Sequence, residues 1–141
     1  MALIHDFLLL EKKYRDNMES LISDYFNGSR EFVTSYIQVD DDLILLTQDT
    51  FNRFKTVWPN DELMEGLAYY GHTVIEHDEV LIVKEVFEEW KSLFMLGDLV
   101  VTSLDEDLVL SCDEVIHTFE ILTKMCEKAI SGEYFILHLG I

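Results

Sequence analysis

Two segments of this chain place three acidic residues directly before an apolar run: VDDDLILL at 39–46 and LDEDLVLS at 104–111. Aliphatic and β-branched residues on both sides of such a break favour strands. A short polar break between two apolar runs is typical of a β-hairpin. The pattern therefore predicts two hairpins whose acidic turns consist of Asp40, Asp41, Asp42, Asp105, Glu106 and Asp107.

The first half of the chain also shows helical spacing of apolar residues. Leu10, Tyr14 and Met18 recur at intervals of four, and Asn27-Gly28 is a helix-stop signal. Pro59 disfavours a helical conformation at the residue before it, so a helix that precedes it is expected to end near Trp58. The expected elements are a helix at 4–26, strands at 31–39 and 43–47, a helix from Asp49 to Trp58, and a helix at 61–70 that ends at Gly71.

The second half contains the clearest helices of the sequence. Apolar residues recur at helical spacing from Val80 to Met95 before Gly97, and Ser111-Cys112-Asp113-Glu114 has the S-x-x-E pattern of a capping box. The expected elements are a short strand or extended link at 72–76, a helix at 79–96, strands at 99–104 and 108–110, a helix from Ser111 that ends by Gly132, and a strand at 134–139.

These elements predict the α+β class. We expect one domain over residues 1–141, with a mainly antiparallel sheet of four to six strands and four to five packed helices. Both halves read as helix, strand, acidic turn, strand and helix. Two explanations stay open: an α-β-β-α pseudo-duplication, or two similar solutions to forming a hairpin.

The charge balance is the strongest anomaly of the composition. The chain has 28 acidic and 10 basic residues, for a formal net charge of −18. No base lies between Lys91 and Lys124, where seven acids occur. Such an excess weakens the fold through self-repulsion, so it indicates either a need for solubility or a basic partner. The same charge disfavours direct binding to nucleic acid or to an anionic membrane.

The cysteines and the N-terminal residues bear on the compartment. Cys112 and Cys126 fall on one predicted helix, where about 1.5 Å per residue holds them roughly 21 Å apart and prevents a disulfide between them. Residues 1–13 have a short apolar stretch interrupted by Asp6, which matches neither a signal peptide nor a membrane span. We expect a cytoplasmic protein with free thiols.

The sequence contains no complete catalytic or metal-binding motif. Asp40 to Asp42 lack the alternating ligands of an EF-hand, and Glu114 with His117 supplies only half of a di-iron pattern. Polar residues at 72–79 could support acid–base chemistry, but this composition is more often an exposed connector. No nucleophile or nucleotide-binding signature is present. We therefore expect neither a metal, nor a cofactor, nor enzymatic activity.

A basic protein partner accounts best for these features. The profile resembles that of bacterial immunity proteins, which neutralise nuclease-type or other cationic toxins, in being small, acidic and free of catalytic motifs. The alternatives are an acidic regulatory, adaptor or self-associating domain and, third, an enzyme that uses the His and acid cluster. Besides the acidic turns, the expected partner-binding residues are Tyr69, Tyr70, Glu76, Asp78 and Glu79, because aromatic anchors amid charge are common in binding hot spots.

Overall fold

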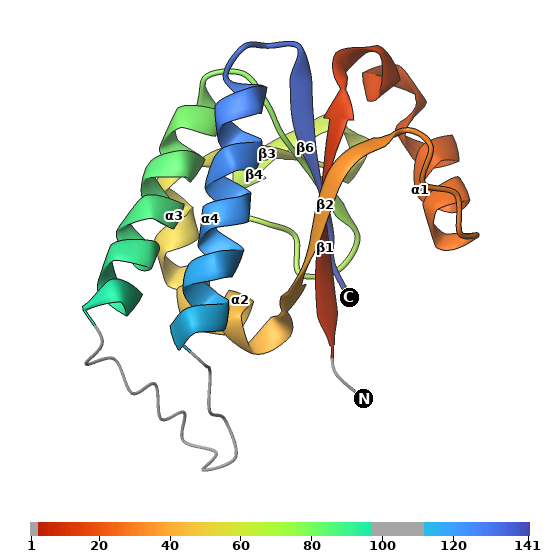
Figure 1. The fold of residues 1–141 in the computed structure, drawn as a ribbon. Helices are drawn as coiled ribbons and strands as arrows, with labels where there is room; N and C mark the ends of the chain where they lie inside the picture. The colour runs from red at the N-terminus through yellow and green to blue at the C-terminus, as the bar shows by residue number, and fades with distance from the viewer. Residues whose placement is uncertain (1–2, 97–111) are drawn as a thin grey trace.

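A computed structural model describes residues 3–96 and 112–141 and places all their strands in one antiparallel sheet. The strand order is β2-β1-β6-β5-β3-β4, so strands from the two ends of the sequence, β1 and β6, lie side by side in its interior (Figure 1). The strands are β1 (Ile4–Glu11), β2 (Val33–Asp40), β3 (Lys55–Trp58), β4 (Glu62–Glu65), β5 (His72–Ile75) and β6 (Tyr134–Leu139).

Helices cover both faces of this sheet. The two long helices α3 and α4 run side by side on one face, together with α2, whereas α1 lies on the other face (Figure 1). The α-helices are α1 (Met18–Phe26), α2 (Asp41–Thr47), α3 (Glu79–Met95) and α4 (Cys112–Ala129). Three short 3-10 helices complete the described elements: η1 (Lys12–Asn17), η2 (Gln48–Arg53) and η3 (Pro59–Asp61).

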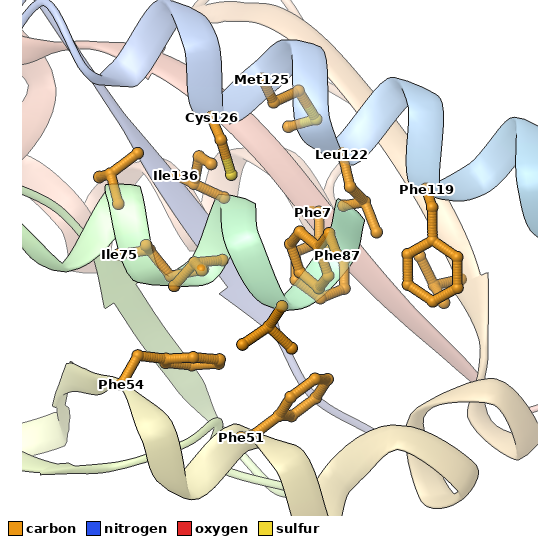
Figure 2. Packing of buried hydrophobic residues seen from close by; sticks show 14 of the residues in the cluster. Phe7, Phe51, Phe54, Ile75, Phe87, Phe119, Leu122, Met125, Cys126 and Ile136 are labelled. Carbon is orange, nitrogen blue, oxygen red and sulfur yellow. The ribbon is translucent and has the colours of Figure 1, made fainter. Parts of the chain in front are cut away.

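The sheet separates two apolar cores. Phe7 of β1 meets Phe87 of α3 edge to face, with ring centroids 6.5 Å apart, at the centre of the larger core under α3 and α4 (Figure 2). The smaller core lies under α1 and contains Leu8, Leu10 and Tyr25. Alternate residues of β1 therefore enter different cores, and Phe7 to Leu10 are all apolar because both faces of this part of the strand are buried.

This double burial explains why the predicted helix at 4–26 is wrong over its first half. Phe7 to Leu10 form a continuous apolar run, which periodicity alone does not distinguish from a buried helix. The chain instead forms β1, then η1, and becomes α-helical only at Met18. The predicted helix end at Asn27-Gly28 is confirmed, because Gly28 adopts a φ of +97°.

The first acidic segment is not a hairpin turn. The Asp40 side chain accepts a hydrogen bond from the Asp42 backbone N–H at 2.9 Å and caps α2. Residues 43–47 are therefore helical rather than a second strand. Aspartate is both a good turn residue and a good N-cap, and here the buried side chains of Leu43 and Ile44 favour the helix by packing into the larger core.

Residues 49–70 also differ from the prediction. Phe51 and Phe54 are buried side by side, with centroids 5.3 Å apart, but η2 and β3 replace the expected helix from Asp49 to Trp58. The expected helix at 61–70 contains β4 instead, whose four residues are all exposed at the edge of the sheet. The apolar spacing correctly predicted that both phenylalanines are buried, but it predicted the wrong secondary structure for this segment.

The α+β class and the antiparallel sheet are confirmed, as are α3, α4, β5 and β6. The second hairpin, with Asp105, Glu106 and Asp107, and the Ser111 cap lie outside the described residues. The first half does not read helix, strand, turn, strand and helix, so it does not provide the α-β-β-α unit on which the pseudo-duplication depends.

Candidate functional site

Four polar side chains are buried together on the α3 and α4 side of the sheet. His5, Thr73 and His138 are 0% exposed and Asp41 is 6% exposed. The sheet register brings the first three together, because His138 of β6 pairs with Phe7 of β1 on one side and Thr73 of β5 on the other. Asp41 begins α2, directly after β2. Polar groups buried to this degree need hydrogen-bond partners.

These side chains supply partners to one another in a continuous row. Thr73 Oγ1 lies 2.7 Å from His138 Nδ1, and His138 Nε2 lies 2.9 Å from His5 Nδ1. His5 Nε2 lies 2.8 Å from Asp41 Oδ1, and the Tyr69 hydroxyl donates to Asp41 Oδ2 at 2.8 Å. We call this row of Thr73, His138, His5, Asp41 and Tyr69 the His–Asp chain.

More than one arrangement of protons satisfies the bonds of the His–Asp chain, and one of them leaves both rings neutral. An ionised Asp41 accepts from Tyr69 and from the Nε2–H of His5, which leaves His5 Nδ1 as an acceptor. His138 then donates from Nε2, and its Nδ1 accepts from the Thr73 hydroxyl. Both imidazoles are neutral in this arrangement. Burial, and then the neighbouring His5, lower the pKa of His138 to about 3, which keeps that ring neutral.

The far end of the His–Asp chain reaches the surface at two adjacent tyrosines. The hydrogen bond to Asp41 raises the pKa of Tyr69 to about 12 and fixes its ring. Tyr70 packs edge to face on that ring, at a centroid distance of 4.9 Å, and is itself 73% exposed. Asp42 acts on the same Tyr69 hydroxyl through its charge. We call Asp40, Asp42, Tyr69 and Tyr70 the Tyr–Asp end of the molecule.

Backbone contacts hold the tyrosines in place from the other side. The Gly140 N–H donates to the Gly71 carbonyl at 2.7 Å, and the Ile141 N–H donates to the Tyr69 carbonyl at 3.1 Å. A Cβ at residue 140 would lie 2.8 Å from the Tyr69 carbonyl carbon, so only glycine permits this approach. The Tyr–Asp end is thus fixed by residues from four separate parts of the sequence.

The structure divides the predicted partner-binding residues into two groups. Asp40, Asp42, Tyr69 and Tyr70 come together at the Tyr–Asp end, whereas Asp41 is buried behind them and positions them instead of meeting a partner. Glu76, Asp78 and Glu79 follow the opposite end of β5, a strand of four residues that spans roughly 13 Å.

Internal contacts engage two members of this second group. Arg15 Nε donates to Glu76 Oε2 at 2.8 Å, and the Lys55 backbone N–H donates to Glu79 Oε2 at 3.0 Å. Glu76 therefore links η1 to the end of β5, and Glu79 links β3 to the start of α3. They do not join the Tyr–Asp end in one surface.

Sequence reasoning missed His5, Thr73 and His138, although the two histidines carry a signal. His5 stands two residues before the buried apolar run FLLL of β1, and His138 stands between the buried Leu137 and Leu139 of β6. A histidine within a strand buried on both faces requires a hydrogen-bond partner on another element. What the sequence did not reveal is that the partners are each other and Asp41.

The histidines and acids considered earlier for chemistry lie apart from the His–Asp chain. His77 is exposed and Glu114 and His117 lie on the exposed side of α4. Within residues 3–96 and 112–141, no group of three or more His, Cys, Asp or Glu side chains is arranged to hold a metal ion. The His5 and His138 rings themselves do not reach solvent.

Comparisons with known proteins return no match for this chain: no family model, no curated protein and no solved structure is similar to it. Over the part of the chain that the structure describes, no helix has the length and apolar character needed to cross a membrane.

Proposed function

We propose that this chain is an acidic cytoplasmic protein that masks a basic protein partner, and specifically a bacterial immunity protein that neutralises a nuclease-type or other cationic toxin. The proposal rests on the net charge of −18 together with the Tyr–Asp end, where the fold holds the exposed Asp40 and the half-buried Asp42 near an exposed aromatic ring.

The anchoring of Tyr69 at the Tyr–Asp end is the observation that carries this proposal. Tyr70 is a large exposed side chain, yet its neighbour Tyr69 is anchored through Asp41 and His5 to the centre of the sheet. A side chain that is fixed before binding loses less conformational entropy when a partner docks. Tyrosines of this kind, surrounded by polar groups, are frequent binding hot spots.

The chemistry of the proposed partner complements this surface. A nuclease presents lysine and arginine to the phosphates of its substrate, and carboxylates can occupy the same positions. Opposite charges also steer the two proteins together and raise association rates by about 10 to 10³-fold at low salt. The same acidic surface repels nucleic acid and anionic lipid, so the proposal includes neither as a direct partner.

The test begins with the product of the gene directly upstream, where a toxin gene normally precedes its immunity gene. That protein is purified with the chain, and its toxic or nuclease activity is measured with and without the chain. We expect inhibition at equal concentrations, and association that slows steeply as salt is raised. An acidic partner, or an association rate that does not depend on salt, would contradict the proposal.

A charge-matched pair of variants tests the Tyr–Asp end itself. Asp40→Asn with Asp42→Asn removes two charges there, while asparagine at 40 can still cap α2. Asp49→Asn with Glu114→Gln removes two charges from η2 and α4. The first pair should slow association more than the second. Equal effects would show that only total charge matters and that the Tyr–Asp end has no specific role.

A regulatory, adaptor or self-associating domain is the second candidate, and one observation favours it. α3 exposes Leu81, Leu93 and Met95, together with Leu96 directly after it. Exposed apolar side chains on one helix are typical of surfaces that pair with another protein. This candidate predicts a partner or self-association that persists at high salt, and sedimentation at low and high salt distinguishes the two functions.

A further inference from the structure

The two edges of the sheet differ in how they are protected against pairing with another chain. Natural proteins protect an edge strand by making it short or by placing charges or proline on it. β4, at one edge, has four residues and a glutamate at each end. β2, at the edge nearest the viewer in Figure 1, has eight residues, and its stretch VTSYIQV at 33–39 contains neither a charge nor a proline. β2 is therefore the unprotected edge.

The strand register shows which backbone groups of β2 point away from the sheet. The Asp41 N–H donates to the Leu3 carbonyl at 3.0 Å, so these two residues form a hydrogen-bonded pair. Hydrogen-bonded pairs recur at every second residue of an antiparallel register, so the residues of β2 bonded to β1 are Ser35, Ile37 and Val39. Tyr36 and Gln38 therefore direct their N–H and C=O groups outward. Within residues 3–96 and 112–141, no strand other than β1 pairs with β2.

The side chains of β2 leave this outer edge accessible. Tyr36 pairs with Leu8 of the smaller core, so its side chain lies on the α1 face, yet it remains 53% exposed. Gln38 is exposed on the same face, and Ile37 is only half-buried on the other face. The one irregularity of the register lies opposite Leu9 and Leu10, near the start of β2. The rest of the strand is thus a regular and open template for a further strand.

The charge of the chain indicates which strand this edge fits. Two copies that each carry a net charge of −18 repel one another, and like charges directly opposite on paired strands are destabilising. Residues 33–39 bring no charge to the edge, so two copies can meet there without opposing carboxylates. A partner attracted by charge would gain nothing from this neutrality. The neutral edge therefore favours a second copy of the same chain.

An antiparallel register about a twofold axis at Ile37 satisfies the outward backbone groups. It pairs Tyr36 with Gln38 of the second copy, and each such pair exchanges two backbone hydrogen bonds. The two Ile37 side chains then lie opposite one another in a non-hydrogen-bonded pair, where side chains are closest and an apolar contact is favourable. Asp40 falls opposite Thr34, so the two Asp40 carboxylates do not face each other.

We propose that two copies of this chain pair through β2 and form a homodimer with one continuous antiparallel sheet. The interface is isologous, because the same strand supplies both of its sides. This inference is independent of the proposed function, since a monomer can mask a basic partner and a dimer can lack one. One strand pair buries a small area, so we expect a Kd in the micromolar range or weaker.

Sedimentation equilibrium of the intact chain tests the dimer, from low micromolar to near-millimolar concentration. We expect the dimer Kd to fall as salt is raised, because salt screens the repulsion between the two copies. Association with a basic partner should weaken with salt, so the two interactions have opposite signatures. A monomer at every concentration and salt level would overturn the homodimer and leave the proposed function standing.

Two substitutions at residue 38 test the strand itself. Gln38→Pro removes the outward N–H but no hydrogen bond to β1, and proline is tolerated on an edge strand whose N–H faces solvent. Gln38→Thr is the matched control, because it keeps the N–H and favours a strand. The proline variant should raise the dimer Kd about tenfold relative to the threonine variant. Equal Kd values would overturn pairing through β2 and would point to another surface, such as the exposed apolar residues of α3.

Hydrogen exchange of the unmodified chain gives a second measurement that does not depend on how the proline variant folds. The N–H groups of Tyr36 and Gln38 should exchange more slowly as the dimer forms, whereas that of Ile37 is already bonded to β1 and should change less. Unchanged exchange at Tyr36 and Gln38 in a sample that is dimeric by sedimentation would overturn the inference. Inhibition of the upstream protein tests the proposed function separately, so either can fail alone.

Discussion

Replacing His138 with glutamine should make the folding stability of this protein less sensitive to acid. His138 has a pKa of about 3 in the fold and 6.5 as a free side chain, because burial disfavours the imidazolium. Between these two values the unfolded chain binds a proton that the folded chain does not. Stability from this residue is therefore complete above pH 6.5 and is lost progressively as pH falls toward 3.

The magnitude follows from the proton linkage. Each pH unit between the two pKa values costs about 1.4 kcal/mol, so His138 alone should remove about 2 kcal/mol of stability between pH 7.5 and pH 5.0. At pH 5.0 the stability lost through His138 depends almost entirely on its free pKa of 6.5, because its pKa in the folded protein is far lower. This pH also stays above the sequence pI of about 4.3, where low net charge would promote association.

Urea unfolding of the wild type and His138→Gln at both pH values measures the effect. Glutamine weakens the His–Asp chain and lowers stability at every pH, but it cannot take up a proton, so only the difference in pH dependence is informative. Carboxylates titrate in both proteins and cancel. The exposed His117→Gln serves as the control and should keep the wild-type pH dependence. Parallel losses in wild type and His138→Gln would refute a neutral buried His138.

Three further predictions follow from the same contacts. Gly140→Ala should cost about 1–3 kcal/mol in urea unfolding, since its Cβ would overlap the Tyr69 carbonyl; an unchanged midpoint would contradict this packing. Asp41→Ala should cost about 1–3 kcal/mol because it leaves the buried Nε2 of His5 without its partner, and Tyr70 should become more mobile by NMR relaxation. Cys126 is buried with its pKa raised to about 12, mainly by desolvation, so a thiol reagent should modify it only after unfolding; rapid modification of the native protein would disagree.

The parts of the fold that sequence predicted correctly share a physical reason. α3 and α4 each have one buried face and one solvated face, so apolar residues such as Val83 and Phe119 recur at helical spacing. β1 was missed because burial on both faces removes any alternation. Asp40 was misread because N-caps and turns favour the same residue types, and tertiary packing decided between them.

The sequence predicted some residues of the candidate site, but it did not predict which of them contact one another. Asp41 and Tyr69 were both singled out, yet their contact depends on β1, β5 and β6 meeting in one sheet. Glu76 was grouped with the tyrosines by sequence proximity, whereas Arg15, far earlier in the chain, is its partner. Local sequence does not specify such pairings, because strand order determines which loops meet.

This distinction changes what the charge of −18 means for function. Asp41, Glu76 and Glu79 contribute to that charge, but their carboxylates hold α2, η1 and β3 in place and have little freedom to meet a partner. The acids left for recognition are therefore fewer than the composition indicates. They also lie on a framework that the His–Asp chain makes rigid at the Tyr–Asp end, so position should determine the strength of binding there more than the total number of charges.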